Sequence, residues 1–331
     1  MKQQFIFGLA ILLLMVLVPL VSLQGAGARG REAEEVTSVR QLETSPATEP
    51  AGIEQAPQNE ETIQVVRTAS GKTETLAMRE YLIGCVAAEM EADHHLEALK
   101  AQAVASYTYA RYRRETGGRE ALNDSGKSDQ GYDDARRRGE RWGDNAGLYE
   151  AKVAQAVDAV LGQTITYEGQ PIFAAYCALS GGKTESAANY WGDDFPYLRS
   201  VDSPGDKLSP DYSKTVTLQP EDVKKALGKA EGVKLGKDPS TWFGKPERSE
   251  AGAVMEIEVG GKTLSGRAVR ELLELRSANF TIGYKNGAFE VKCLGYGHGV
   301  GMSQYGADFM ARQGSGYKEI LEHYYAGCKI E

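Results

Sequence analysis

Glu89 is the carboxylate whose position in the sequence most favours acid chemistry. It lies near the end of a segment, 77–91, in which apolar residues recur at helical spacing, so one stripe of this helix should face a core. At about 100° per residue, Glu89 falls within about 20° of Leu82, in the middle of that stripe, whereas Glu80 and Glu91 fall opposite. Burial raises the pKa of a carboxyl group, as a general acid requires near neutral pH. The alternative is a glutamate paired with a buried arginine or with a helix N-terminus.

A first glycine-containing loop, 180–185, is a candidate for ligand binding. It begins Ser180-Gly181-Gly182, and paired glycines let backbone N–H groups approach a ligand closely. Tyr190 and Trp191 follow soon after, and aromatic rings beside polar loops suit the amphipathic faces of sugars. The alternative is a tight turn with Trp191 packed in the core.

A second glycine-rich loop surrounds His298. Four glycines in the seven residues 295–301 exclude a regular element there, and a helix is expected to follow at 303–312. A lone histidine is usually structural, but a histidine in a glycine-lined loop that leads into a helix is a candidate site residue.

The sequence carries no compact metal or redox motif. His94 and His95 are adjacent, so their side chains should point different ways in a solvated loop. The cysteines form no CxxC pair, and the sequence leaves open whether Cys293 and Cys328 are bridged. A net charge of −8 argues against a nucleic-acid-binding protein.

The remaining patterns predict an α+β fold of mixed helices and short antiparallel hairpins around a cleft. We expect strands at 62–68, 215–218 and 255–259, and hairpins at 164–168/171–178 and at 280–284/288–294, the latter turning at Asn286-Gly287. Further helices are expected at 96–114, 146–161, 220–227, 266–275 and 317–325. Segment 117–143 looks irregular, with its charged run 133–138 as a solvated face.

The N-terminus is expected to anchor the protein in a membrane. Residues 5–23 are apolar or small, a length that spans a bilayer and favours an uncleaved anchor at 1–23, although 24–28 could be a signal cleavage site. Residues 24–61 are acidic and poor in apolar side chains, which predicts a disordered linker. The folded domain is expected at 62–331.

Five motifs in order resemble the stage II sporulation protein D family, which includes the amidase enhancers. The resemblance runs from about Thr62 to the C-terminus. Its strongest pieces are Glu97-Ala-Leu-Lys-Ala-Gln-Ala-Val-Ala, Ser180-Gly-Gly-Lys-Thr-Glu, Trp191-Gly, Tyr197-Leu-Arg-Ser-Val-Asp-Ser-Pro, and Gly297-His-Gly-Val-Gly-Met-Ser-Gln-Tyr-Gly.

The resemblance implies a lytic transglycosylase that cleaves stem-less peptidoglycan glycan strands between N-acetylmuramic acid and N-acetylglucosamine, after a partner amidase has removed the stem peptides, and leaves 1,6-anhydro ends. It implies Glu89 as the catalytic acid and septal wall remodelling during engulfment, and we expect no cofactor. It further implies a membrane-anchored protein between forespore and mother cell, working with the amidase stage II sporulation protein P and the scaffold stage II sporulation protein M. Candidate residues for substrate binding are Ser180, Gly181, Gly182, Tyr190, His298, Gln304 and Tyr305.

Two other function classes stay open, and two departures from the family pattern matter. The alternatives are a non-catalytic glycan-binding enhancer of a cell-wall amidase, and a hydrolase that uses Cys177 and His298. Some family members carry a zinc-binding Cys-x4-His-Cys cluster before a Gln-x-Tyr motif. Here the motif is present as Gln130-Gly-Tyr132, but the cluster positions hold Asn123, Ser128 and Asp129, so we expect no zinc. Position 177 is also Cys, and Ala178-Leu179 replace the hydroxyl residues often found before Ser180, which puts a side-chain role for those two positions in doubt.

Overall fold

The computed structural model describes residues 61–331. The predicted anchor at 1–23 and all but the last residue of the predicted linker lie outside this range. Within 61–331, no helix is long and apolar enough to cross a membrane. The α+β class is confirmed, because helices and several small sheets share the chain.

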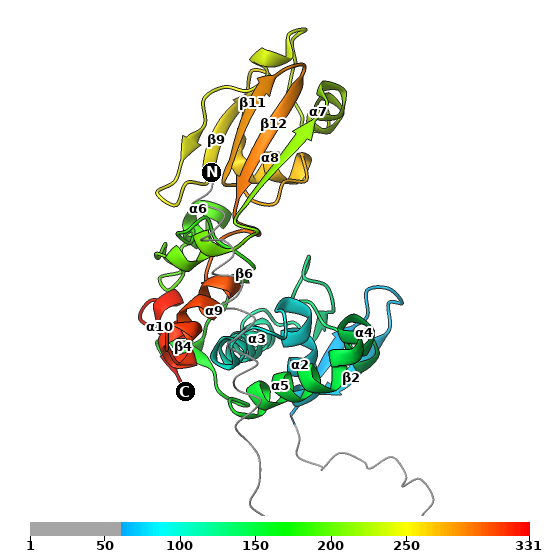
Figure 1. Cartoon of the computed structure of the whole chain (residues 1–331), viewed down its shortest axis with the longest axis vertical. Helices are drawn as coiled ribbons and strands as arrows, with labels where there is room; N and C mark the ends of the chain where they lie inside the picture. Colours follow the sequence, from blue (N-terminus) through cyan, green and yellow to red (C-terminus); the bar gives the residue numbers. More distant parts are fainter. Residues whose placement is uncertain (1–60) are drawn as a thin grey trace, which may run out of the picture. The chain divides into compact units, whose positions relative to one another are not determined.

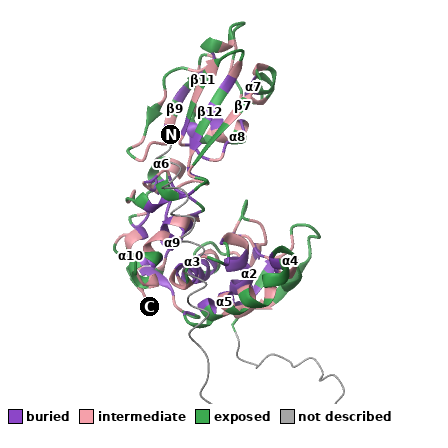
Figure 2. Ribbon diagram, viewed as in Figure 1, coloured by how far each residue is buried: buried purple, intermediate pink, exposed green. Residues whose placement is uncertain are grey.

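The first part of the fold holds Glu89 on a buried helix. Strands β1 (Thr62–Val66) and β2 (Thr73–Ala77) form an antiparallel hairpin, and β3 (Ala121–Asn123) pairs with β1 in parallel. Helix α2 (Met78–Glu89) follows the hairpin and packs against α3 (Leu96–Glu115) and α5 (Ala146–Asp158) (Figure 1). Both α2 and α3 are buried over much of their length (Figure 2).

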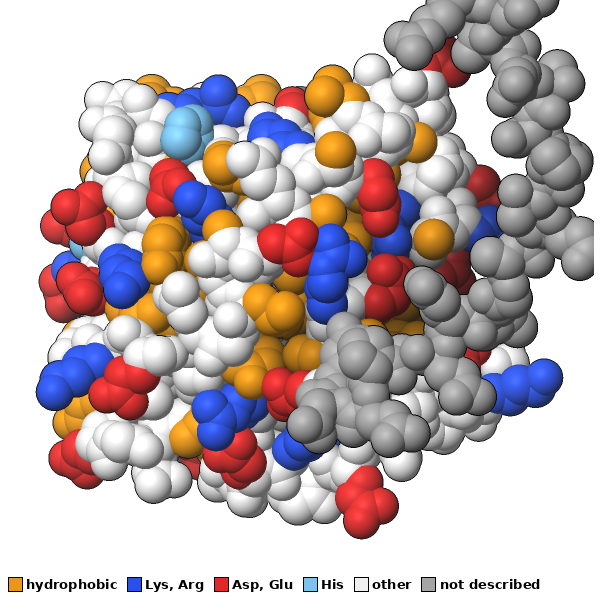
Figure 3. Space-filling view, turned by 90° about the horizontal axis from the view of Figure 1, so that it is seen from below, with side chains coloured by type: hydrophobic (Ala, Val, Ile, Leu, Met, Phe, Trp, Pro, Cys, Tyr) orange, Lys and Arg blue, Asp and Glu red, His pale blue; other side chains and the backbone are white. Residues whose placement is uncertain are grey.

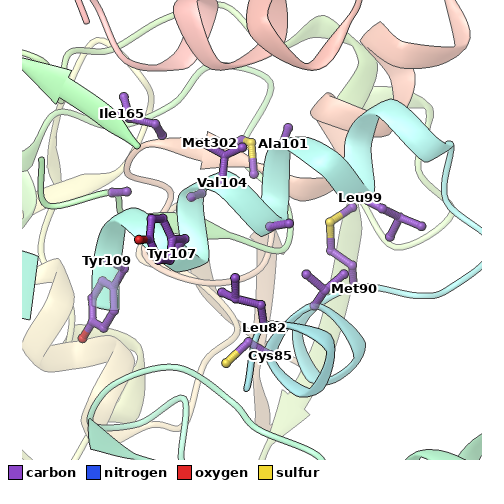
Figure 4. Packing of buried hydrophobic residues seen from close by; sticks show 14 of the residues in the cluster. Leu82, Cys85, Met90, Leu99, Ala101, Val104, Tyr107, Tyr109, Ile165 and Met302 are labelled. Atoms are coloured by element: carbon purple, nitrogen blue, oxygen red, sulfur yellow. The ribbon is translucent and has the colours of Figure 1, made fainter. Parts of the chain in front are cut away.

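The contact between α2 and α3 is the centre of the first hydrophobic core. Met90 lies beside Leu99 of α3, and Leu82, Val104 and Met302 belong to the same buried cluster (Figure 4). The apolar spacing in α2 predicted this buried stripe, and burial of each such side chain contributes roughly 1.5–3 kcal/mol. The helix therefore has a fixed rotation, which points its last residue, Glu89, in one direction.

The segment 117–143 is more ordered than predicted. It contains β3 and a helix, α4 (Ala135–Trp142), with Asp134 accepting a hydrogen bond from the backbone N–H of Arg137 as its N-cap. The prediction of a wholly solvated charged face is wrong, because the Arg138 side chain is only 1% exposed. Its guanidinium donates to Glu150 and Glu80, so its charge is paired inside the fold.

The predicted hairpin 164–178 divides between two sheets. Strand β4 (Ile165–Tyr167) pairs with β5 (Gln170–Pro171) and with β14 (Lys329–Ile330). A turn in which the Ala175 N–H donates to the Phe173 carbonyl then redirects the chain. Strand β6 (Tyr176–Cys177) consequently pairs in parallel with β13 (Met302–Ser303), which brings the Ser180 loop beside the His298 loop.

A second hydrophobic core lies in the region of residues 213–294. Its sheets are β7 (Ser213–Leu218), β12 (Ala288–Leu294) and β11 (Phe280–Lys285), and β8 (Glu247–Arg248), β9 (Val254–Val259) and β10 (Lys262–Ser265). Helices α7 (Pro220–Leu227) and α8 (Gly266–Leu272) contribute Leu227 and Val269 to this core (Figure 1). The predicted Asn286-Gly287 turn is confirmed, with φ of 53° and 83° at its two central residues.

Three more α-helices lie in the described residues. The structure also places Cys293 and Cys328 in different cores. The three helices are α6 (Ala187–Trp191), α9 (Gln304–Arg312) and α10 (Tyr317–Tyr324). Helix α8 ends earlier than predicted because Glu274 has a left-handed φ of 53°, which a helix cannot include. Cys293 belongs to the second core and Cys328 to the first, and both thiols are free.

Candidate active site

Glu89 ends α2 with its carboxyl group largely withdrawn from water. Its Oε1 accepts a hydrogen bond from the Gly131 backbone N–H, and the side chains of Tyr176 and Gln304 also bond to it. Burial raises the pKa of Glu89, and these three hydrogen bonds oppose the rise in part because they favour the charged form. The raised pKa was predicted from the apolar stripe. The alternative of an arginine partner is not seen, because no residue of 61–331 forms an ion pair with Glu89.

A chain of buried hydrogen bonds fixes the groups that touch Glu89. The Tyr176 hydroxyl donates to Gln130 Oε1 over 2.9 Å, and Gln130 Nε2 donates to the Tyr81 hydroxyl over 3.0 Å. On the other side, Gln304 Nε2 donates to Gln102 Oε1 over 3.1 Å. Because these polar groups are satisfied internally, each is held in one orientation. The network therefore presets the position of the carboxyl group.

Glu89 opens onto a cleft of about 1180 Å³. The cleft is lined by aromatic, small and cationic side chains from several segments of the chain. They include Glu89, Tyr109, Arg113, Phe173, Tyr176, Tyr190, Trp191, Arg267, Arg270, Arg276, Tyr296, His298 and Gln304. A cleft of this size, with aromatic surfaces and a few polar groups, has the character of a site for a large, amphipathic ligand.

Tyr190, Trp191 and His298 form an aromatic wall of the cleft. The ring centroids of Trp191 and His298 are 5.0 Å apart, and those of Tyr190 and His298 are 5.8 Å apart. His298 Nδ1 accepts from the Val300 N–H, and its ring also bonds to the Tyr176 backbone. Burial and the nearby Arg270 charge lower the pKa of His298 to about 4, so the ring is neutral at physiological pH. The neutral His298 ring presents a surface to the cleft, and proton transfer is left to Glu89.

Four of the predicted substrate-binding residues do not line this cleft. Ser180 is buried, where its hydroxyl and backbone N–H both donate to Asp206 Oδ2. Gly182 adopts a φ of +94° and faces Lys207, while Gly181 lies beside Asn279. The backbone N–H of Tyr305 donates to the Ala178 carbonyl. Of the predicted set, the cleft brings together Glu89, Tyr190, His298 and Gln304.

The residues present do not fit a zinc ion at the family's cluster positions. Asp129 is fully buried, and its carboxylate accepts hydrogen bonds from Arg119 and from the side chain and backbone of Asn123. Ser128 bonds the backbone carbonyl of Ser125. The described range 61–331 contains no cluster of three metal-ligating side chains.

Sequence reasoning missed several residues that shape the site. Gly131 contacts Glu89 from a loop more than forty positions further along the chain, and only the Gln130-Gly-Tyr132 motif hinted at it. Tyr176 was expected in a strand, and Arg270 fell within the helix expected at 266–275 without being singled out. No local pattern marked either of them, since both reach the cleft through pairing between distant segments.

Comparison with known proteins identifies similar chains. A family model described as stage II sporulation protein matches residues 67–167. The stage II sporulation protein D of Bacillus subtilis (strain 168) is 38% identical over 339 residues, with 99% of this chain and 96% of that protein covered. The protein of the same name from Bacillus amyloliquefaciens is 36% identical over 336 residues, with 98% and 93% covered. The amidase enhancer of Bacillus subtilis (strain 168) is 25% identical over 306 residues, which cover 75% of this chain and 40% of that protein.

Proposed function

The chain belongs to the stage II sporulation protein D family, whose members are involved in sporulation, and on this premise we propose that its cleft cleaves peptidoglycan. The proposed reaction is that of a lytic transglycosylase, which breaks the bond between N-acetylmuramic acid and N-acetylglucosamine. The observation that carries the proposal is the buried Glu89 carboxyl group, with its raised pKa and no cationic partner, at the cleft surface.

The proposed mechanism uses Glu89 twice. Protonated Glu89 donates its proton to the glycosidic oxygen, and the C1–O bond breaks with positive charge developing on the muramic ring. The resulting carboxylate is stabilised by the Gly131 N–H and the Gln304 amide, and by Tyr176 once its single hydroxyl proton turns from Gln130 to Glu89. It then takes the proton of the muramic C6 hydroxyl, whose oxygen bonds to C1 and closes the 1,6-anhydro ring. The nucleophile belongs to the substrate, so no second carboxylate is required.

Product analysis tests the reaction directly. Purified protein is incubated with peptide-free glycan strands, and the products are weighed by mass spectrometry. We expect 1,6-anhydromuramic ends, which are lighter by one water than hydrolysed ends and resist borohydride reduction. The Glu89→Gln variant should fold normally and lose at least about a hundredfold in rate, because a general acid contributes that much or more. Reducing muramic ends as the main product would refute the transglycosylase and favour a two-carboxylate hydrolase.

A non-catalytic role is the second candidate, and the distant likeness to a protein named amidase enhancer favours it. In that case the cleft binds glycan and stimulates a separate amidase. The same incubation discriminates the two, because an enhancer alone releases no product from peptide-free strands. If Glu89→Gln still stimulated an amidase as well as the unaltered protein, the enhancer role would be independent of glycan cleavage.

The Cys177–His298 hydrolase has little physical support. Burial raises the pKa of the Cys177 thiol to about 12, so almost no thiolate forms at neutral pH. His298 is already committed to two backbone bonds through its ring. Neither group is therefore prepared to activate the other.

We also propose a cellular setting, which the resemblance to the family supports. The protein is expected to act at the cell membrane through a single N-terminal span, with the 62–331 domain on the outer side between forespore and mother cell. Its expected partners are glycan strands, the amidase stage II sporulation protein P and the scaffold stage II sporulation protein M. Fractionation of sporulating cells, with protease protection of the folded domain, tests the location.

A further inference from the structure

Arg270 is the arginine of the cleft that has no carboxylate partner. Arg113 pairs with Asp129, Arg267 with Glu271, and Arg276 with Asp211. Arg270, in contrast, forms no ion pair with any residue of 61–331. Its Nε donates to the Leu275 carbonyl over 3.2 Å, and its Nη1 donates to the Tyr190 hydroxyl over 2.6 Å. Both of these acceptors are neutral, so the positive charge is uncompensated.

The two hydrogen bonds orient the guanidinium of Arg270 and leave part of it available. The half-buried side chain lines the cleft, and its Nη2 has no partner among the described residues. A guanidinium donates to a carboxylate through a rigid, planar set of N–H groups, and such bonds are stronger when water is partly excluded. A preoriented cation without a counterion is thus suited to bind an anionic group of a ligand.

Arg270 supplies a permanent positive charge beside the aromatic wall formed by Tyr190, Trp191 and His298. His298, next to it, is neutral at physiological pH and adds no charge of its own. Tyr190 receives a hydrogen bond from Arg270 and offers a ring surface to the cleft. Arg267 also lies over the Tyr190 ring, 5.6 Å from its centroid, but it is paired with Glu271. The combination of a ring and one cation without a carboxylate partner fits a sugar that carries a single carboxylate.

We propose that Arg270 binds the free lactyl carboxylate of muramic acid and is the residue through which the cleft distinguishes strands without stem peptides, the substrate that the family resemblance already implies. The inference rests on the proposed function. Muramic acid bears its lactyl group on C3, and the carboxyl of that group is an anion only when no peptide is attached, because the peptide converts it to a neutral amide. C3 is two ring carbons away from C1, the carbon at which the glycosidic bond breaks. The group that binds the lactyl carboxylate therefore does not have to lie next to Glu89.

Two matched substrates test the effect of the negative charge on the lactyl carboxylate. One glycan preparation is peptide-free, and a second is the same material with its lactyl carboxyls converted to methylamides. For the unaltered protein we expect kcat/KM to be roughly ten- to hundredfold higher on the carboxylate strands, the range for a hydrogen bond to a charged group. Arg270→Gln should reduce that ratio to within about threefold. Arg267→Gln, on the same helix but already paired with Glu271, should keep the ratio.

The ratio separates recognition from a structural effect, since a disturbed cleft lowers the rate on both substrates together. Calorimetric binding with Glu89→Gln protein supplies a measurement that needs no turnover. If the unaltered protein cleaves neither substrate, the proposed function fails, and the binding preference still tests Arg270. Equal binding of the two strands, or a preference that survives in the Glu89→Gln/Arg270→Gln double variant, would overturn the proposal.

Discussion

At the scale of single residues, Glu89 is subject to two opposing influences. Burial penalises its charged form, whereas the Gly131 N–H, Tyr176 and Gln304 favour that form. Burial has the larger effect, so the pKa of Glu89 is raised. The same three hydrogen-bond partners can stabilise the carboxylate after proton transfer. A group with this balance can donate a proton and then accept one within the same turnover.

The first prediction concerns the pH dependence of activity. Because the Glu89 pKa is raised, the protonated form persists to higher pH than in a glutamic acid exposed to water, whose pKa is about 4.3. The rate should fall as pH rises through the folded-state pKa, since the acid form is lost. Single-turnover rates on peptide-free strands across the pH range measure this limb. A rate that still increases above about pH 9 would contradict a carboxylic general acid.

The second prediction concerns Gly131→Ala. A Cβ at this position would lie 3.0 Å from Glu89 Oε1 and 3.1 Å from the Ala88 Cβ, so the carboxyl group must shift by a few tenths of an ångström. We expect kcat to fall by roughly tenfold or more, because general-acid catalysis depends on position. Gly126→Ala is the matched control, since its Cβ would make an ordinary 3.6 Å contact with the same oxygen. Equal rates in the two variants would show that this contact does not position the acid.

At the scale of elements, α4 shows how a charged run becomes part of the interior. Arg138 donates to Glu150 through Nε and Nη2, to Glu80 through Nη2, and to the Asp133 carbonyl through Nη1. These bonds join α4 to both α2 and α5. Arg136, two positions earlier, is 68% exposed and pairs only with Glu140 of its own helix.

The third prediction compares these two arginines. Arg138→Ala should lower the free energy of unfolding by about 1.5–3 kcal/mol, the range for hydrogen bonds to charged groups. Arg136→Ala should change it by less than about 0.5 kcal/mol, as exposed pairs within a helix do. Urea denaturation of both variants gives the comparison. Similar losses for the two would mean that the bonds of Arg138 contribute no more than a surface pair.

The fourth prediction concerns the 119–131 segment, where the Asp129 carboxylate accepts hydrogen bonds from Arg119 and Asn123. Their mutual bonds take up the acceptor groups that a metal would need. We therefore expect purified protein to contain no stoichiometric zinc and to keep its thermal midpoint on treatment with a chelator. Elemental analysis and a thermal scan check this. One zinc per chain, together with a midpoint lowered by chelation, would refute it.

At the scale of the whole molecule, the charge of the cleft differs from the charge of the chain. The net charge is −8, and acidic and basic side chains are interspersed over the face shown in Figure 3. The cleft nevertheless gathers Arg113, Arg267, Arg270 and Arg276 along its lining. A local positive field of this kind attracts anionic ligands even to an acidic protein, and salt should weaken that attraction.

The fifth prediction links the site to the stability of the fold. The folded-state pKa of Glu89 is raised, so its contribution to stability is fully present below the unfolded-state pKa and is lost as pH rises through the folded-state pKa. Glu89→Gln removes this linkage. The stability of the variant relative to the unaltered protein should therefore rise as pH increases above the unfolded-state pKa of about 4.3, and level off once the folded-state pKa is passed, as measured by urea denaturation at each pH. A difference that is independent of pH would mean that burial does not perturb this group.

The sequence by itself determined the features that rest on local spacing. The apolar period of 77–91 placed Glu89 on a buried stripe, because helix geometry relates residues only three or four positions apart. The Asn286-Gly287 turn was equally local, since it depends on the backbone preference of two residues.

Only the tertiary structure decided which groups meet at the cleft. The parallel pairing of β6 with β13 joins segments more than a hundred residues apart, and it places Tyr176 and His298 near Glu89. No local period encodes such a pairing, because it follows from how complete elements pack. The burial of Arg138 and the unpaired charge of Arg270 have the same origin: an arginine has the same intrinsic preferences on a surface and in an interior, and its neighbours in space determine which role it takes.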